Sequence, residues 1–210
     1  MGKEKAIKNI IFDMGGVLFD LHADRCIEAF EAIGAHKTAA YVRDFRTEDM
    51  FHLIEVSSGT TVQFCDEVRS LDSINASDEA ITSAWNALLG TTPQDKRDLL
   101  LQLKSEGYNM FLLSNTNEIH WNKAKTIIAG GEHDINDFFD RIFLSYEMNL
   151  RKPDKEIFRR VLEQADIDAD ETVFIDDNAQ NVASAQELGI RTFHETDSHR
   201  WVDSLKDLLA

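Results

Sequence analysis

The chain has 210 residues and a formal net charge of −16, from 38 acidic and 22 basic residues. Such a field repels nucleic acid and anionic membranes, so neither is expected as a partner, and any phosphate site needs its own local cations. The hydrophobic content of 43% is that of a globular protein, and Cys26 and Cys65 stand apart without metal-binding spacing, which favours a reducing, cytoplasmic location.

The first predicted element is an apolar run, Ile10-Ile11-Phe12, that ends at Asp13. A fully apolar run of this kind is typical of a buried parallel strand. Gly15 and Gly16 follow at once and would let the backbone turn tightly next to a ligand. A carboxylate at the tip of a central strand is costly unless it works with a metal or a substrate. Taken alone, the segment fits an ordinary strand-to-helix turn equally well.

The next part of the chain reads as helices without an intervening strand. Apolar residues recur at helical spacing over 24–33, 39–56, 62–68 and 79–89. Thr60 or Thr61 and Ser77 are candidate N-caps, and Gly90 is expected to end the last helix. Residues 21–92 are therefore predicted to form an all-helical insert.

Strands and helices alternate in the rest of the chain. A helix is expected to start at Thr92-Pro93, with Pro93 at its first position. Strands are expected at 110–113, in the segment marked by Phe138, Phe139 and Ile142-Phe143-Leu144, at 173–175 and at 190–193. Helices should separate these strands and follow the last one. Such alternation predicts an α/β fold with a Rossmann-like, three-layer parallel-sheet core. We expect residues 1–20 and 93–210 to form this core.

Polar residues end three of the predicted strands. They are Asp13, Ser114-Asn115 and Asp176-Asp177, and a further polar segment, Arg151-Lys152-Pro153, precedes a helix. Each has an ordinary structural explanation when considered singly. Because parallel strands place their carboxyl ends at one edge of a sheet, the combination predicts an active site there.

The order and spacing of these segments resemble the haloacid dehalogenase superfamily of aspartate-nucleophile hydrolases. Residues 12–18 match its first motif, 112–115 the second, Lys152-Pro153 the third, and 174–178 with Asn181 and Gly189 the fourth. The helical insert falls where this family places a C1-type cap. Residues 114–117 and 145–148 also resemble bacterial sugar phosphatases that include glucose-1-phosphatases, and the N-terminal phosphatase domain of soluble epoxide hydrolase.

The resemblance implies a phosphatase site. Asp13 would attack phosphorus and form an aspartyl-phosphate, which splits a difficult hydrolysis into two steps. Mg²⁺ would be held by Asp13, the carbonyl of Gly15 and Asp177, with Asp176 assisting directly or through water. Ser114 and Lys152 would grip the non-transferring oxygens, and backbone amides near Gly15-Gly16 and Asn115 would add donors. The substrate would be a small phosphorylated metabolite.

One position departs from the family pattern. Its phosphatases usually carry a second Asp two residues after the nucleophile, which protonates the leaving group, and here that residue is Gly15. A general acid contributes about 10²- to 10⁴-fold in rate. We therefore expect a substrate with a good leaving group, such as a sugar 1-phosphate. Replacement proton donors are weakly indicated, the candidates being Asp20, His22, His52 and Glu55.

Three other functions stay open on the sequence. A haloacid dehalogenase shares the Asp nucleophile but attacks carbon without a metal and usually has neutral residues where this chain has Asp176-Asp177. A mutase would return the phosphoryl group to a sugar. The absence of the second Asp is also compatible with a noncatalytic binding protein. Dinucleotide binding is disfavoured because Gly15-Gly16 gives no GxGxxG pattern.

Overall fold

The computed structural model describes residues 6–44 and 59–209. Its centre is a sheet of parallel strands in the order β3-β2-β1-β4-β5. The strands are β1 (Asn9–Phe12), β2 (Asn109–Ser114), β3 (Arg141–Leu144), β4 (Thr172–Asp176) and β5 (Arg191–His194). Phe12 is in register with Leu112 on one side and Ile175 on the other, so the carboxyl ends of the three central strands lie level. The predicted α/β fold is confirmed.

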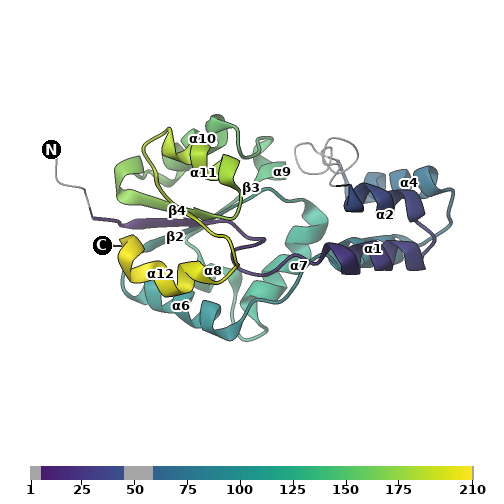
Figure 1. Ribbon diagram of the computed structural model, residues 1–210, viewed down its shortest axis with the longest axis horizontal. Helices are drawn as coiled ribbons and strands as arrows, with labels where there is room; N and C mark the ends of the chain where they lie inside the picture. Colours follow the sequence, from purple (N-terminus) through teal and green to yellow (C-terminus); the bar gives the residue numbers. More distant parts are fainter. Residues whose placement is uncertain (1–5, 45–58, 210) are drawn as a thin grey trace.

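Helices cover both faces of the sheet (Figure 1). One layer contains α6 (Gln94–Ser105), α7 (Glu118–Ala129), α8 (Ile135–Phe138) and α12 (Arg200–Leu209), and the other contains α9 (Ser145–Met148), α10 (Lys155–Ala165) and α11 (Ala179–Gln186), with a short 3₁₀ turn at Ala169–Glu171 before β4. Phe12 packs into the first apolar layer with Trp201, whereas Ile11 packs into the second with Phe158. Alternate residues of β1 thus enter different cores, which is why the strand is apolar throughout.

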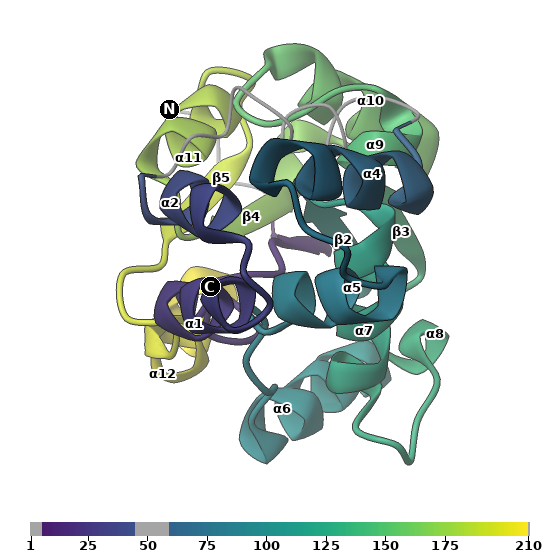
Figure 2. The ribbon, with the colours of Figure 1, turned by 90° about the vertical axis from the view of Figure 1, so that its right-hand side faces the viewer.

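The helical insert lies beyond the carboxyl ends of the strands (Figure 1). It contains α1 (Ala23–Ala32), α2 (His36–Arg43), α4 (Thr61–Asp72) and α5 (Asp78–Asn86), and these helices bury their own apolar cluster around Phe30, Phe64 and Trp85. Figure 2 shows α1, α2, α4 and α5 stacked over the end of the sheet. The division of the chain into core and cap stays a prediction. The predicted helix beyond residue 44, and with it His52 and Glu55, lies outside the described residues.

Helix boundaries follow the capping signals in most places. Thr60 forms a reciprocal capping box with Gln63, and Ser77 accepts a hydrogen bond from the amide of Ala80. At α6 the expected start is wrong by one residue, because Pro93 occupies the N-cap position and Gln94 begins the helix. Within the described residues, no helix combines the length and apolar character needed to cross a membrane.

The expected end of α5 at Gly90 is also wrong. The helix ends at Asn86, and the chain after it pairs with the segment that leaves β1. The amide of His22 donates to the carbonyl of Leu88 (2.7 Å), and the amide of Gly90 donates to the carbonyl of Asp20 (2.9 Å). These bonds outcompete another helical turn and tie together the two linkers between core and insert.

The first turn of α7 fastens the insert to the sheet layers. The ring of His120 stacks on Trp85 with centroids 4.3 Å apart, and its Nε2 lies 3.1 Å from the carbonyl oxygen of Trp85. Thr61 also donates a hydrogen bond from its hydroxyl to Glu118 (2.9 Å). Burial lowers the pKa of His120 from 6.5 to about 4, so the ring is neutral at pH 7.

This histidine should make stability depend on pH. Its folded-state pKa lies below the unfolded value, so the stability it supports is present above pH 6.5 and is lost as the pH falls toward about 4. We expect this titration to remove up to about 3 kcal/mol of the free energy of unfolding. Urea denaturation between pH 7 and pH 4 should show a flatter dependence for His120→Gln than for the native chain. The exposed-site control His36→Gln should keep the native slope, and an equal slope for both variants would contradict the assignment.

Candidate active site

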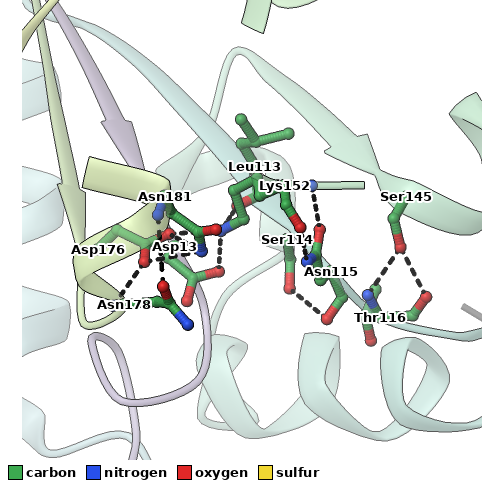
Figure 3. Close-up of polar contacts among 10 residues, drawn as sticks. All are labelled: Asp13, Leu113, Ser114, Asn115, Thr116, Ser145, Lys152, Asp176, Asn178 and Asn181. Carbon is green, nitrogen blue, oxygen red and sulfur yellow. Dashed lines mark hydrogen bonds and ion pairs between the residues drawn. The ribbon is translucent and has the colours of Figure 1, made fainter. Parts of the chain in front are cut away.

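A buried ammonium group lies at the centre of the carboxyl edge of the sheet. The side chain of Lys152 is 1% exposed, and its Nζ donates to Oδ1 of Asp13 (2.7 Å), Oδ2 of Asp176 (2.6 Å) and the carbonyl of Leu113 (3.0 Å) (Figure 3). These three acceptors match the three N–H donors of an ammonium group. The lysine is therefore fully hydrogen-bonded within the protein.

The sheet explains why these groups meet. Asp13 follows β1 directly, Asp176 ends β4, and Leu113 is the penultimate residue of β2. The three strands are neighbours with level ends, so their polar termini converge although they are far apart in the sequence. Asp13 is also anchored through its amide, which donates to the carbonyl of Ile175 (2.9 Å).

Lys152 comes from the loop before α10, and the side chain of Asn115 holds that loop. Asn115 donates from Nδ2 to the carbonyl of Lys152 (2.8 Å), and the amide of Lys152 donates to Oδ1 of Asn115 (2.9 Å). The family resemblance implies a backbone donor role for Asn115 toward substrate. In the structure the side chain of Asn115 holds the backbone of Lys152, the candidate catalytic lysine.

Asp176 is held in place by the start of α11. Its Oδ1 accepts from the amide of Asn178 (2.8 Å) and from Nδ2 of Asn181 (3.0 Å), and the same Nδ2 lies 3.2 Å from Oδ2. Both asparagines belong to the fourth predicted motif, where neither has an expected site role. Their positions after an acidic doublet, at the N-cap and in the first turn of a helix, were the available signal.

Three carboxylates gather at this point, with one ligand oxygen each from Asp13, Asp176 and Asp177 within 4.8 Å of one another. One ammonium group opposes them, so two negative charges are left uncompensated when all three are ionised. Burial raises the pKa of Asp13 to about 7, because desolvation outweighs the attraction of Lys152 and the neighbouring carboxylates add repulsion. Burial and the charge of Asp176 likewise raise the pKa of Asp177. Clustered carboxylate oxygens are the donors that small divalent cations such as Mg²⁺ prefer, so the residues fit such an ion.

The two glycines after Asp13 have separate structural roles. Gly16 has a φ of 74°, and a Cβ built on it would lie 2.3 Å from Oδ2 of Asp177. Only glycine therefore lets the turn approach the acidic cluster. The amide of Gly16 donates to the carbonyl of Phe19 (2.8 Å), so this N–H stabilises the turn, and the expected donor role of Gly16 toward substrate stays a prediction.

The remaining predicted residues surround this centre. Ser114 ends β2 and is buried, and among the residues that the structure describes its hydroxyl makes a single long contact, 3.5 Å to the carbonyl of Asn115. Gly15 faces Leu21, whose Cδ1 would lie 3.0 Å from a Cβ at residue 15. Asp20 and His22 lie in the linker to the insert, where both approach Gly90.

Comparisons with known proteins agree with this arrangement. The model of the haloacid dehalogenase-like hydrolases matches residues 7–189. The chain is 29% identical to D-ribitol-5-phosphate phosphatase of Bacteroides thetaiotaomicron, covering 97% of this chain and 98% of that protein. It is 30% identical to a sesquiterpene phosphatase of Aspergillus oryzae, covering 97% of both.

A solved structure is similar over nearly the whole chain. The HAD family enzyme BT-2542 of Bacteroides thetaiotaomicron, in complex with magnesium and inorganic phosphate, superposes with a TM-score of 0.85 at 40% identity. The superposition covers 93% of this chain and 97% of that one. The matched family region begins before β1 and ends after α11, and so includes Asp13, Lys152 and the acidic doublet. The protein therefore belongs to the haloacid dehalogenase-like hydrolase family.

Proposed function

We propose that this protein is a Mg²⁺-dependent phosphatase that hydrolyses a small phosphate ester through attack of Asp13 on phosphorus. The observation that carries the proposal is the cluster of Asp13, Asp176 and Asp177 around a single buried ammonium group. Two similar proteins are named as phosphatases, and a similar structure was solved with magnesium and phosphate. The paired carboxylates of the acidic doublet argue against a metal-free haloacid dehalogenase.

Asp13 and Asp177 are the residues we expect to hold the metal, together with the carbonyl of Gly15. Asp176 already accepts hydrogen bonds from Lys152, Asn178 and Asn181, so its main task would be to orient the lysine. Bound Mg²⁺ would reduce the repulsion between an anionic nucleophile and an anionic phosphate.

The chain's own residues would then divide the work. Lys152 holds Oδ1 of Asp13 and fixes the orientation of the carboxylate, which is the nucleophile. All three N–H groups of Lys152 have acceptors, so it would act mainly through its charge and its hold on Asp13 while these bonds persist. The hydroxyl of Ser114 would donate to a non-transferring phosphate oxygen. Water would then hydrolyse the aspartyl-phosphate.

The leaving group is where this site differs from its family pattern. Gly15 supplies no proton two residues after the nucleophile, so an ester whose alcohol departs without protonation suits it best. We infer a substrate such as a sugar 1-phosphate, whose anomeric hydroxyl is more acidic than an ordinary alcohol. A cytoplasmic location stays a prediction, consistent with the free, buried thiols of Cys26 and Cys65.

Metal binding should be measurable without any turnover. Mg²⁺ at a hundredfold its dissociation constant would stabilise the protein by about 2.7 kcal/mol, which corresponds to a rise in Tm of roughly 5–10 °C for a chain of this size. Asp177→Asn should lose most of this rise in a thermal-shift titration. The exposed-site control Asp98→Asn should retain it. An equal rise for both variants would place the ion elsewhere.

The nucleophile can be tested by an isosteric change. Asp13→Asn should reduce Mg²⁺-dependent phosphate release by more than about 10³-fold, because an amide cannot form the phosphorylated intermediate. Phosphate release from a panel of esters, with and without chelator, checks this, and acid-quenched mass spectrometry of the native enzyme should find phosphate on the peptide that contains residue 13. If the enzyme instead releases halide from a haloacid at a rate that chelator does not change, the dehalogenase alternative is supported.

The role of Gly15 predicts an unequal effect of adding an acid. Gly15→Asp should raise the rate for alkyl phosphates relative to sugar 1-phosphates by about 10- to 100-fold, because only poor leaving groups need the proton. The end of the Leu21 side chain must shift to admit the new side chain. The comparison uses kcat/KM for glycerol 1-phosphate and glucose 1-phosphate, and a uniform change in both would contradict the inference.

A further inference from the structure

A large, partly exposed apolar side chain, that of Leu21, lies against Gly15, two residues after the proposed nucleophile. Leu21 is 47% exposed, and the other exposed large apolar residue in the described part of the chain is Val62, at 56%. The side chain of Leu21 is packed on one side despite this exposure. A Cβ built on Gly15 would lie 3.0, 3.2 and 3.3 Å from its Cδ1, Cδ2 and Cγ, so the side chain rests against the glycine.

The backbone of Leu21 is fixed by the paired linkers between the sheet layers and the insert. Leu21 and Leu89 form an antiparallel bridge, flanked by the bonds His22 to Leu88 and Gly90 to Asp20 described above. A Cβ on Gly90 would lie 2.6 Å from the carbonyl oxygen of Asp20, so this close approach also requires glycine. Leu21 is thus held at a defined position in the segment between β1 and α1.

The direction of the reaction places the leaving group on this side. Phosphoryl transfer is roughly in line, so the leaving oxygen departs on the side opposite the attacking carboxylate. Lys152 and Asp176 close the sheet side of Asp13, and Asp177 with Gly16 closes a second side. In the family pattern the proton donor to the leaving group stands at residue 15, so we place the departing oxygen beside Gly15 and its neighbour Leu21.

We propose that Leu21 is a specificity-determining residue, whose side chain forms an apolar wall against which the leaving group of the phosphate ester packs. This inference rests on the proposed phosphatase function and deepens it. Where a proton-donating carboxylate would otherwise project from residue 15, the site presents methyl groups. The site should favour esters whose alcohol is apolar next to the bridging oxygen, for example a hydrocarbon chain, an aromatic ring or the CH face of a sugar. Esters that carry polar, hydrated groups at that position should be poorer substrates.

The test compares two alkyl esters whose alcohols have similar acidity, benzyl phosphate and glycerol 1-phosphate, with saturating Mg²⁺. Leu21→Asn, which keeps the number and branching of the side-chain heavy atoms, should lower kcat/KM for benzyl phosphate by about tenfold and for glycerol 1-phosphate by less than about twofold, within the range that a small apolar contact discriminates. The loss should appear mainly in KM, because packing of this kind is present before and during the reaction. Leu21→Met should retain the native preference.

Val62→Asn is the matched control, since it makes the other exposed large apolar residue of the described chain, which lies on α4, polar. It should leave the ratio of the two kcat/KM values unchanged. The inference is overturned if Leu21→Asn lowers kcat/KM equally for both esters, or if Leu21→Met shifts the ratio of the two kcat/KM values as strongly as Leu21→Asn does. The phosphatase assignment stands in either case. If the native enzyme releases no phosphate from any ester with Mg²⁺, the proposed function fails first and this inference fails with it.

Discussion

The site depends on one buried ion network, the ammonium group of Lys152 between Asp13 and Asp176. Removing charged groups from water costs several kcal/mol per ion, and breaking a buried pair typically costs about 3–5 kcal/mol, so the network persists only because every donor is matched. Leu113 supplies the third acceptor, Asn115 holds the lysine backbone, and Asn181 holds Asp176. The network nevertheless carries fewer positive than negative charges. Because negative charge is in excess, a bound divalent cation would stabilise the cluster.

The turn after β1 connects this charge cluster to the insert through two adjacent glycines with different neighbours. Gly16 lies against Asp177, and Gly15 lies against Leu21. One turn therefore sets the shape of the acidic cluster and of the region where a leaving group would depart. The paired linkers connect this turn to α1 and α5 by hydrogen bonds. A substitution in the turn would affect ion binding and substrate preference by separate routes.

Much of the architecture was predictable because it depends on local pattern. The apolar runs ending at Asp13, Ser114 and Asp176 indicate parallel strands, and parallel strands bring their carboxyl ends to one edge. The same rule predicted that Asp13, Ser114 and the acidic doublet would lie together, whereas the role of Lys152 was implied by the family resemblance. The sequence pattern predicted the wrong end of α5, because a nonlocal hydrogen bond from the amide of His22 to the carbonyl of Leu88 forms there instead. Likewise, no pattern in residues 114–117 indicates that the side chain of Asn115, rather than its amide, would do the positioning.

The sequence by itself thus determined the order of strands and helices, the kinds of functional groups at the strand ends, and the absence of a carboxylate at residue 15, since each depends on residue type or short-range spacing. The tertiary structure alone decided that Lys152 has no unmatched donor, that His120 is buried under Trp85, and that Leu21 covers Gly15. The physical reason is that hydrogen-bond saturation, desolvation and steric contact depend on which distant residues become neighbours. Periodicity and composition carry no information about those pairings.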